Sequence, residues 1–406
     1  MTESVLLGSS LRAVPPEVTL ARAQKRAGAL GITRVTDITR LDRVGIPVYA
    51  SIRPAAALGS LCVSAGKGLR PIEAEVGAYM EAIELALAEP GASHVTTVRA
   101  PARDVLEGRA RPDSILDLCP KMGVAIDLDA PIDCVFADDV VTSERALVPA
   151  ELVFVPFRPH PRFESLFGTS SNGLASGNTV REATVHALAE LIERDVCSFE
   201  AVRDTSVPVD LDSVSGPARR LVDLVLAAGL ELYVRAVRNA FGLPYFHALI
   251  NDPDACAPHL LSGGYGCHPH RRVAFVRAVS EAAQSRLSFI HGGRDDLALT
   301  YARFAGWSRS RKRAFVMGVT ARASRGDRVP MDAIDDHEAT TSTLEPCEAL
   351  LVRGLHRVGL RRVYRVAFTR PDEDLQIVRV IVPGLELFRG SLQRVGARLR
   401  DHARAS

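Results

Sequence analysis

The spacing of apolar residues predicts three long amphipathic helices. Apolar side chains recur every three or four positions, the period of an α-helix, across residues 71–89, 180–202 and 272–290. Pro71 suits the first turn of the first helix, where its missing backbone N–H costs no hydrogen bond. Shorter helical patterns cover residues 19–30, 217–228 and 345–358.

Runs of β-branched and aromatic residues between Gly, Pro and Asp predict short strands. We expect strands within residues 32–54 and at residues 62–65, 95–100, 124–129, 152–157, 231–238, 245–251, 363–369 and 376–384. Two glycine-rich stretches, residues 168–179 and 262–266, are predicted to be loops, and a loop-rich stretch precedes the helix at 345. No repeat at a fixed period is visible. This mixture of helices and strands predicts an α+β fold.

No linker between residues 60 and 390 is long enough to require a domain boundary. We therefore expect one domain over residues 41–390, an N-terminal extension over residues 1–40 and a C-terminal tail over residues 391–406.

Composition narrows the classes of function. The 406 residues are 47% hydrophobic and 24% charged, with a formal net charge of +2, so the chain as a whole has no electrostatic attraction for nucleic acid or an anionic membrane. No apolar run is long enough to span a bilayer, and the first residues do not resemble a signal peptide. The seven cysteines are scattered, without a CxxC pair, which predicts free thiols in the cytoplasm.

Acidic and amide side chains share one face of each long helix, because positions three and four apart lie on the same side. The residues on these faces are Glu81 and Glu84; Glu182, His186, Glu190 and Glu193; and Arg277, Glu281 and Gln284. Two interpretations are open. The faces are either solvated surface, as is usual for glutamate, or they converge on cations.

One observation favours the second interpretation: the first helix has no basic residue between Ile72 and Pro90 to relieve the repulsion between its acids. Carboxylate and amide oxygens are hard ligands that suit Mg²⁺, which in turn binds phosphate groups. The Gly66-Lys67-Gly68 segment and the loop from Asn172 to Asn178 suit a close approach of backbone to phosphate. The sequence has no GxxxxGK[ST] motif, which excludes a P-loop.

Three segments together resemble the YcaO superfamily. They are SNGLASGNTVREATVHALAELIERD at residues 171–195, GKG followed by MEAIE at residues 80–84, and RAVSEAAQSR at residues 277–286 followed by GGRDD. Their order and spacing match, and the likeness runs from about residue 40 to about residue 390. The resemblance implies a YcaO-type mixed sheet, with three long helices lining a site for ATP and Mg²⁺.

The resemblance also implies roles for individual residues. Those that match the family's magnesium-binding acids are Glu81, Glu84, Glu190 and Glu193. Those that match nucleotide-contacting positions are Asn178, Glu182, Arg194, Arg277 and Glu281, together with Lys67 in the GKG segment. Gln284 and Arg286 match the third motif, and His186 is expected to form hydrogen bonds within the same site. No residue is assigned as catalytic nucleophile or base.

Several positions depart from the superfamily pattern, because Gly77 stands where Ser is common, Leu85 where Arg is common and Ala175 where Ser is common. Every acidic position is retained, so we expect ATP binding to be retained too. The segments LDRVGIPVYASIRP, MEAIELALAE and VRVIVPGLE resemble the subgroup encoded beside a TfuA protein, which is associated with thioamide formation. The sequence ends in RLRDHARAS, without the proline-rich PxPxP tail of the azoline-forming branch.

The expected activity is ATP-dependent phosphorylation of a peptide amide oxygen, followed by thioamide formation with sulfide from a TfuA-like partner. An azoline-forming cyclodehydratase and a macrolactamidine-forming enzyme are alternatives, and so is a non-catalytic scaffold. We expect a precursor peptide as substrate, a separate leader-peptide-binding protein and a homodimer, the last from resemblance alone.

Overall fold

We analysed a computed structural model that describes residues 4–106, 114–158, 164–388 and 392–405. The chain divides into two compact units. Unit 1 comprises Met1–Ala56, Leu61–Ile83 and Thr205–Cys347; unit 2 comprises Ala57–Ser60, Glu84–Asp204 and Glu348–Ser406. The expected boundary at residue 40 lies within unit 1 and stays a prediction, and the expected start of the tail at residue 391 lies outside the described residues.

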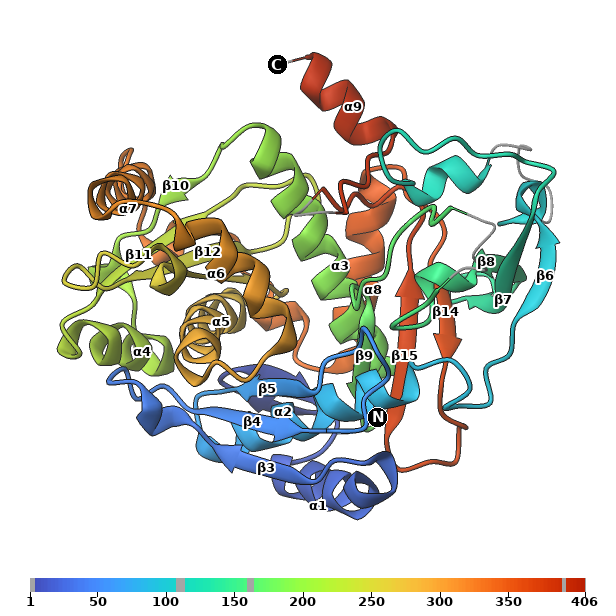
Figure 1. The fold of residues 1–406 in the computed structure, drawn as a ribbon, viewed down its shortest axis with the longest axis horizontal. Coiled ribbons are helices and arrows are strands. Elements are labelled where there is room, and N and C mark those ends of the chain that lie inside the picture. Colours follow the sequence, from blue (N-terminus) through green and yellow to red (C-terminus); the bar gives the residue numbers. More distant parts are fainter. Residues whose placement is uncertain (1–3, 107–113, 159–163, 389–391, 406) are drawn as a thin grey trace. The chain divides into compact units, whose positions relative to one another are not determined.

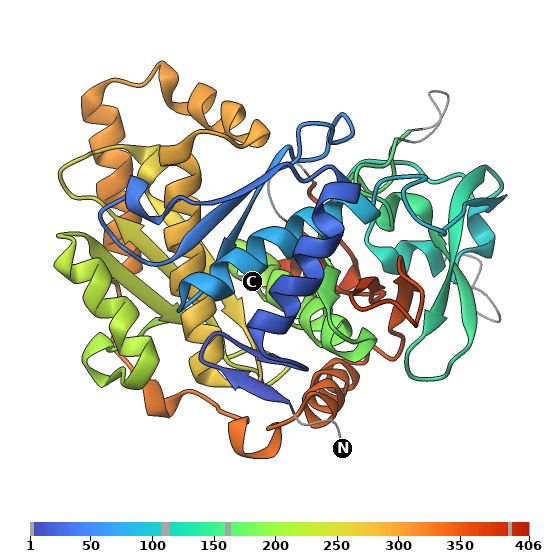
Figure 2. The ribbon, with the colours of Figure 1, turned by 90° about the horizontal axis from the view of Figure 1, so that it is seen from below.

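Unit 1 contains three antiparallel sheets. A hairpin pairs β1 (Val5–Leu7) with β2 (Ser10–Arg12), near the N-terminus in Figure 2. A second sheet has the order β3 (Arg34–Asp37), β4 (Val48–Ile52) and β5 (Val63–Lys67). The third has the order β10 (Val207–Pro208), β11 (Glu231–Ala236), β12 (Tyr245–Asn251) and β13 (Ser262–Cys267).

The helices of unit 1 include α1 (Pro16–Ala27), α4 (Gly216–Ala227), α5 (Arg271–His291), α6 (Ala298–Ala305) and α7 (Arg309–Ala323). Its main core lies where α4 and α5 pack on the sheet of β11, β12 and β13 (Figure 1). Phe246 of β12 and Phe275 of α5 meet there edge to face, with ring centroids 5.5 Å apart, and both are fully buried. The apolar face of α5 is thereby fixed against this sheet.

Unit 2 is built on one sheet with the order β6 (Val98–Pro101), β7 (Pro131–Asp139), β14 (Tyr364–Ala367), β15 (Gln376–Ile381) and β9 (Leu174–Gly177). Strand β8 (Arg145–Pro149) also pairs with β7. Helix α3 (Val180–Val202) packs on β9 and β15, and α9 (Ala397–Arg404) contacts α3. Helices α2 (Pro71–Leu87) and α8 (Leu344–Arg357) each contain residues of both units.

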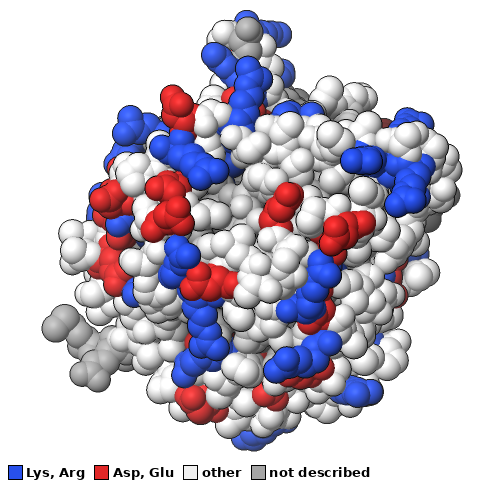
Figure 3. Space-filling model, turned by 90° about the vertical axis from the view of Figure 1, so that its left-hand side faces the viewer, with Lys and Arg blue, Asp and Glu red and all other residues white. Residues whose placement is uncertain are grey.

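The α+β class is confirmed, but the expected mixed sheet is corrected: each strand pair in the named sheets of the described chain is antiparallel. Short connections such as residues 252–261, between β12 and β13, suffice for antiparallel neighbours. None of the described helices combines the length and apolar character needed to cross a membrane. On the face shown in Figure 3, positive and negative side chains are interspersed.

The three long helices share one local design that the sequence analysis did not identify. Each follows a strand after a short turn: β5 leads to α2, β9 to α3 and β13 to α5. Glu81, Glu190 and Glu281 are each the eleventh residue of their helix, and Glu84, Glu193 and Gln284 are each the fourteenth. This strand–turn–helix arrangement recurs at unequal intervals along the chain, so the sequence shows no repeat at a fixed period.

Glycine in the strand lets each helix lie close to it. A Cβ atom on Gly66 would lie 2.0 Å from the Ala74 carbonyl oxygen, and one on Gly266 would lie 2.0 Å from the Ala274 carbonyl oxygen. On Gly177 it would lie 2.7 Å from the Ala183 amide nitrogen. These contacts give the glycines a packing role. The loop predicted over residues 168–179 is wrong at Leu174–Gly177, which is strand β9, and the loop predicted over residues 262–266 is wrong because Ser262–Cys267 is strand β13.

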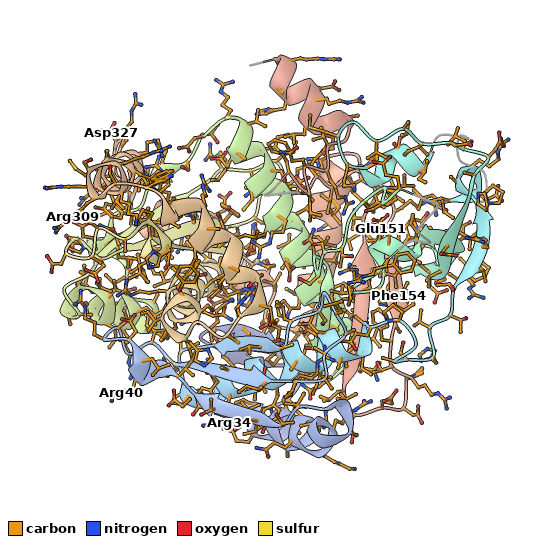
Figure 4. The ribbon with its side chains drawn as sticks, viewed as in Figure 1. Arg34, Arg40, Glu151, Phe154, Arg309 and Asp327 are labelled. Carbon is orange, nitrogen blue, oxygen red and sulfur yellow. The ribbon has the colours of Figure 1, made fainter. Side chains whose placement is uncertain are left out.

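Other sequence predictions failed for local reasons. The expected strand at residues 124–129 is absent because the Asp127 side chain accepts a hydrogen bond from the Asp129 N–H, forming a turn. The one at 152–157 is replaced by a 3₁₀ turn at Ala150–Leu152, and Pro156 has no N–H to donate. The loop-rich stretch contains α6 and α7; Arg309 begins α7, and Asp327 follows its end (Figure 4).

Candidate functional site

One group of predicted residues lies together in unit 1. We call the predicted residues Lys67, Glu81, Glu281 and Gln284, together with Arg294, the Lys67 cluster. The Lys67 Nζ donates to Glu281 Oε2 at 3.0 Å, which joins β5 to α5. The Ala65 N–H donates to Glu81 Oε2 at 3.0 Å, and the Gln284 side chain donates to the Ala65 carbonyl oxygen. Strand β5 therefore positions side chains from two helices.

The electrostatics of the Lys67 cluster centre on Glu81. Burial raises the pKa of Glu81, and Arg294, the Ala65 N–H and Lys67 counter only part of this increase. Nearby Glu281 raises the pKa further. Burial lowers the pKa of Arg294, but its hydrogen bonds to Asp296 and the negative charges of Asp296, Glu81 and Asp295 together outweigh this and raise the pKa overall. A cation beside Glu81 would stabilise its ionised form.

The remaining predicted residues of unit 1 lie elsewhere on α5. Arg277 precedes Glu281 by one helical turn. Burial, His270 and, to a smaller extent, Arg277 hold the pKa of His268 well below its usual value. Arg286 is buried and pairs with Asp42 at 2.8 Å and Asp252 at 3.2 Å. The two carboxylates balance the positive charge of Arg286. The contact between Arg286 and a nucleotide stays a prediction.

A second group surrounds the start of α3 in unit 2. Thr179 is the N-cap, and its hydroxyl accepts a hydrogen bond from the Glu182 N–H at 3.1 Å. The Glu182 carboxylate accepts bonds from the Asn178 backbone N–H at 3.0 Å and from its side-chain amide at 3.3 Å. The TVRE segment is therefore a variant of the capping box, and it holds the two predicted residues Asn178 and Glu182 together.

Glu190 and Glu193 lie further along α3. Together with Glu84 of α2, Ser176, Arg194 and Arg379, they form the group that we call the Glu190 cluster. The Ser176 hydroxyl of β9 donates to Glu84 Oε1 at 2.5 Å. Glu193 is only 2% exposed, and its Oε1 lies 3.4 Å from Arg194 Nη1. Glu190 acts electrostatically on Arg379 of β15 and raises its pKa against a larger effect of burial.

The burial of these acids bears on the two interpretations of the sequence. None of Glu81, Glu84, Glu190, Glu193 and Glu281 is fully exposed, and His186 is also partly buried. The acidic faces are therefore not fully solvated surface, and their convergence on cations stays a prediction. Buried carboxylates are costly unless they are hydrogen-bonded or paired with a cation.

The donor set fits Mg²⁺. No group of three or more His, Cys, Asp or Glu side chains within the described ranges is arranged to hold a metal by itself. Mg²⁺ is commonly held by one or two carboxylates, with water and substrate phosphates completing its coordination. Glu190 and Glu193, three residues apart on α3, have the donor chemistry of such a pair. The metal-binding roles of all four predicted acids stay predictions.

Arg379 and Ser176 are absent from the residues that the sequence patterns select. Arg379 is the one charged residue in the strand sequence QIVRVI, each residue of which is buried. A charge within a buried strand was the signal that could have identified it. All seven cysteines are free, which confirms the expectation of no disulfide.

The chain is similar to known proteins over most of its length. Residues 65–386 match the family model described as YcaO cyclodehydratase, ATP- and Mg²⁺-binding. An uncharacterized protein of Methanothermobacter thermautotrophicus is 35% identical over 400 residues, 96% of this chain and 99% of that protein. An uncharacterized protein in the tfuA 3′ region of Rhizobium leguminosarum bv. trifolii is 32% identical over 395 residues, 93% of this chain and 89% of that protein.

A solved structure is similar over nearly its whole length. The YcaO of Methanopyrus kandleri, bound with AMPPCP and Mg²⁺, superimposes with a TM-score of 0.76 at 27% identity and covers 98% of each chain. The family match spans most of the sequence and includes the acidic positions of all three long helices. The chain belongs to the YcaO family.

Proposed function

We propose that the chain is an ATP-dependent enzyme that activates a backbone amide of a peptide by phosphorylating its oxygen. The observation that carries the proposal is the recurrence of partly buried acids at the same two positions of α2 and α3, with Glu281 and Gln284 at those positions of α5. Family membership supports ATP and Mg²⁺ as the co-substrate and the metal.

The proposed roles follow the chemistry of each side chain. Glu81, Glu84, Glu190 and Glu193 would hold Mg²⁺, and bound Mg²⁺ neutralises phosphate charge and orients the transferring phosphoryl group. The basic side chains of Lys67, Arg194, Arg277 and Arg294 would balance the phosphate charge of ATP. The amide groups of Asn178 and Gln284 and the polar side chains of Glu182, Glu281 and His186 would bind and orient the nucleotide.

The reaction needs activation because an amide oxygen is a poor leaving group. In the proposed sequence, hydrosulfide adds to the carbonyl carbon and gives a tetrahedral oxyanion. This oxyanion attacks the γ-phosphorus of ATP and displaces ADP. Loss of the sulfur-bound proton and cleavage of the C–O bond then release phosphate and form C=S. Most of the work asked of the protein is positioning and charge neutralisation.

Thioamide formation is the product class that we favour. The Rhizobium relative that is 32% identical is named for its place in the tfuA 3′ region, which supports a functional link with a TfuA-like protein. We propose that such a partner delivers sulfide and that the substrate is a ribosomally made peptide. The setting that we propose is the cytoplasm.

Azoline formation is the second candidate, because the matching family is described as cyclodehydratase. Here a neighbouring Cys, Ser or Thr side chain of the peptide would replace hydrosulfide as the nucleophile. Mass spectrometry of the product separates the two: thioamide formation raises the peptide mass by exchanging oxygen for sulfur, whereas cyclodehydration removes one water.

The enzyme proposal is tested with Glu190→Gln, which keeps the size of the side chain and removes its charge. We expect the variant to keep its circular dichroism spectrum and to lose at least roughly a hundredfold in peptide-dependent ATP turnover, because a hard cation needs the carboxylate charge. Glu17→Gln on α1 makes the same change at an exposed position and should retain wild-type turnover. Wild-type turnover in Glu190→Gln would refute the metal assignment.

A further inference from the structure

A pocket inside unit 2 contains a buried positive charge with unused hydrogen-bonding capacity. Its lining includes Asn172, Gly168, Leu191, Arg379 and Arg394. All of these residues belong to unit 2. Arg379 is 2% exposed, although it carries a full charge in its protonated form.

The hydrogen bonds of Arg379 leave part of its guanidinium free. Its Nε donates to the Leu152 carbonyl oxygen at 2.5 Å, and its Nη2 donates to the Ser170 carbonyl oxygen. Its Nη1 is buried and has no hydrogen-bond partner. Two carbonyl oxygens fix the orientation of the side chain but do not neutralise it, so the group is held ready for an anion.

The acids near the pocket do not supply that anion. Glu151, labelled in Figure 4, also lines the pocket, but it accepts hydrogen bonds from the backbone N–H groups of Leu166, Phe167 and Gly168 at 2.9, 3.1 and 2.7 Å and from the Ser165 hydroxyl. Glu190 acts on Arg379 electrostatically, yet burial prevails and lowers the pKa of Arg379 to about 9. The guanidinium therefore lacks full compensation in the folded chain.

A second polar group in the same pocket is also unsatisfied. The side-chain oxygen of Asn172 is buried and has no hydrogen-bond partner. A half-turn of the amide plane exchanges its oxygen and nitrogen positions, so Asn172 can present an N–H donor instead. Gly173 beside it has φ of +83°, and a Cβ there would lie 2.5 Å from the Val380 carbonyl oxygen, which holds this loop against β15.

We propose that Arg379 and Asn172 form a binding subsite for inorganic phosphate. Phosphate matches the donors because a tetrahedral oxyanion accepts several hydrogen bonds at once and brings the charge that the guanidinium lacks. The partly buried Arg394 adds a second positive charge to the lining. We further propose that this subsite takes the phosphate released from the activated amide, and this step rests on the proposed function. The binding of inorganic phosphate itself does not depend on the proposed function.

The test is calorimetric titration of the full chain with inorganic phosphate, without nucleotide, Mg²⁺ or peptide. Wild type should bind phosphate, and Arg379→Gln should weaken the affinity by roughly tenfold or more, because hydrogen bonds to a buried charge are lost. Arg145→Gln removes an equal charge at an exposed position of β8 and should bind as wild type does. No binding by wild type, or equal binding by Arg379→Gln, overturns the subsite.

A second variant keeps the proposal testable if Arg379→Gln fails to fold. Asn172→Asp places a carboxylate in the pocket without changing side-chain size, and it should raise the melting temperature of the ligand-free chain while abolishing phosphate binding. Unchanged phosphate affinity in Asn172→Asp would overturn the proposal.

Phosphate titration in the presence of AMPPCP and Mg²⁺ should give the same phosphate affinity as titration without them. Competition between AMPPCP and phosphate would overturn free phosphate as the occupant and assign the pocket to a nucleotide phosphate. These measurements report phosphate binding and not ATP turnover. If phosphate does not bind at this subsite, the proposed function is therefore unaffected.

Discussion

The substitution Gly66→Ala tests whether the GKG segment is a packing device. In the structure, a Cβ on residue 66 would lie 2.0 Å from the Ala74 carbonyl oxygen and 2.1 Å from the Ala78 nitrogen. Both atoms belong to the backbone of α2, so no change of side-chain rotamer relieves the clash. The helix would have to withdraw by about 1 Å to restore the shortest separation that real Cβ atoms show.

The expected cost follows from that geometry. Overpacking a well-packed core usually destabilises a protein by about 1–3 kcal/mol, and a clash with rigid backbone belongs at the upper end of this range. A loss of about 3 kcal/mol corresponds to a fall of roughly 6–12 °C in Tm for a compact unit of this size. Because α2 also carries Glu81, its displacement should lower ATP turnover as well.

The assay is thermal unfolding of the ligand-free protein, followed by circular dichroism. Gly28→Ala is the matched control: its φ is −61°, and an added Cβ there meets no atom within 4 Å. The control should be neutral or slightly stabilising. An unchanged Tm for Gly66→Ala together with weakened nucleotide binding would refute the packing argument and support a phosphate-binding role for the GKG segment.

Three other predictions follow from burial. Glu81→Gln should raise the Tm of the ligand-free protein at neutral pH, because burial raises the pKa of Glu81 and so penalises its ionised form. The same substitution should abolish ATP turnover, because it removes a proposed Mg²⁺ ligand. A lower Tm would contradict the first expectation. Burial raises the pKa of Asp195 from 3.8 to about 6. The protonated carboxyl should therefore contribute up to about 3 kcal/mol to the free energy of unfolding below pH 4, and this contribution should be lost as the pH rises through 6. In denaturation curves measured over this pH range, Asp195→Asn should lack that change. Burial raises the pKa values of Cys119 and Cys134, so both thiols should resist alkylation by iodoacetamide in the native protein and react after unfolding; rapid native labelling, mapped by mass spectrometry, would be the opposite result.

The sequence predicted helices better than glycine-rich strands. The bounds of α3 match the predicted residues 180–202, because a capping segment marks its start and the apolar period runs without a break. Strands β9 and β13 were predicted as loops because glycine has low strand propensity. In the fold, closely packed helices require those glycines, and this tertiary requirement lies outside any local pattern.

The candidate site shows a similar division. Helical geometry alone places Glu190 and Glu193 on one face, so local spacing was enough to select them. The hydrogen bond between Ser176 and Glu84 joins residues far apart in sequence, and no local rule predicts it. Arg379 was missed because a strand pattern reports burial but does not say which loop carbonyls will meet a buried guanidinium.

The central claim is that the acids of the long helices serve Mg²⁺-dependent ATP binding. Its most direct test is calorimetric titration of the full chain with AMPPCP, with and without Mg²⁺, for the wild type and Glu190→Gln. The account predicts binding by the wild type that requires Mg²⁺ and is strongly weakened in the variant. Absence of binding by folded wild type in the presence of Mg²⁺, or equal binding by the variant, would contradict it.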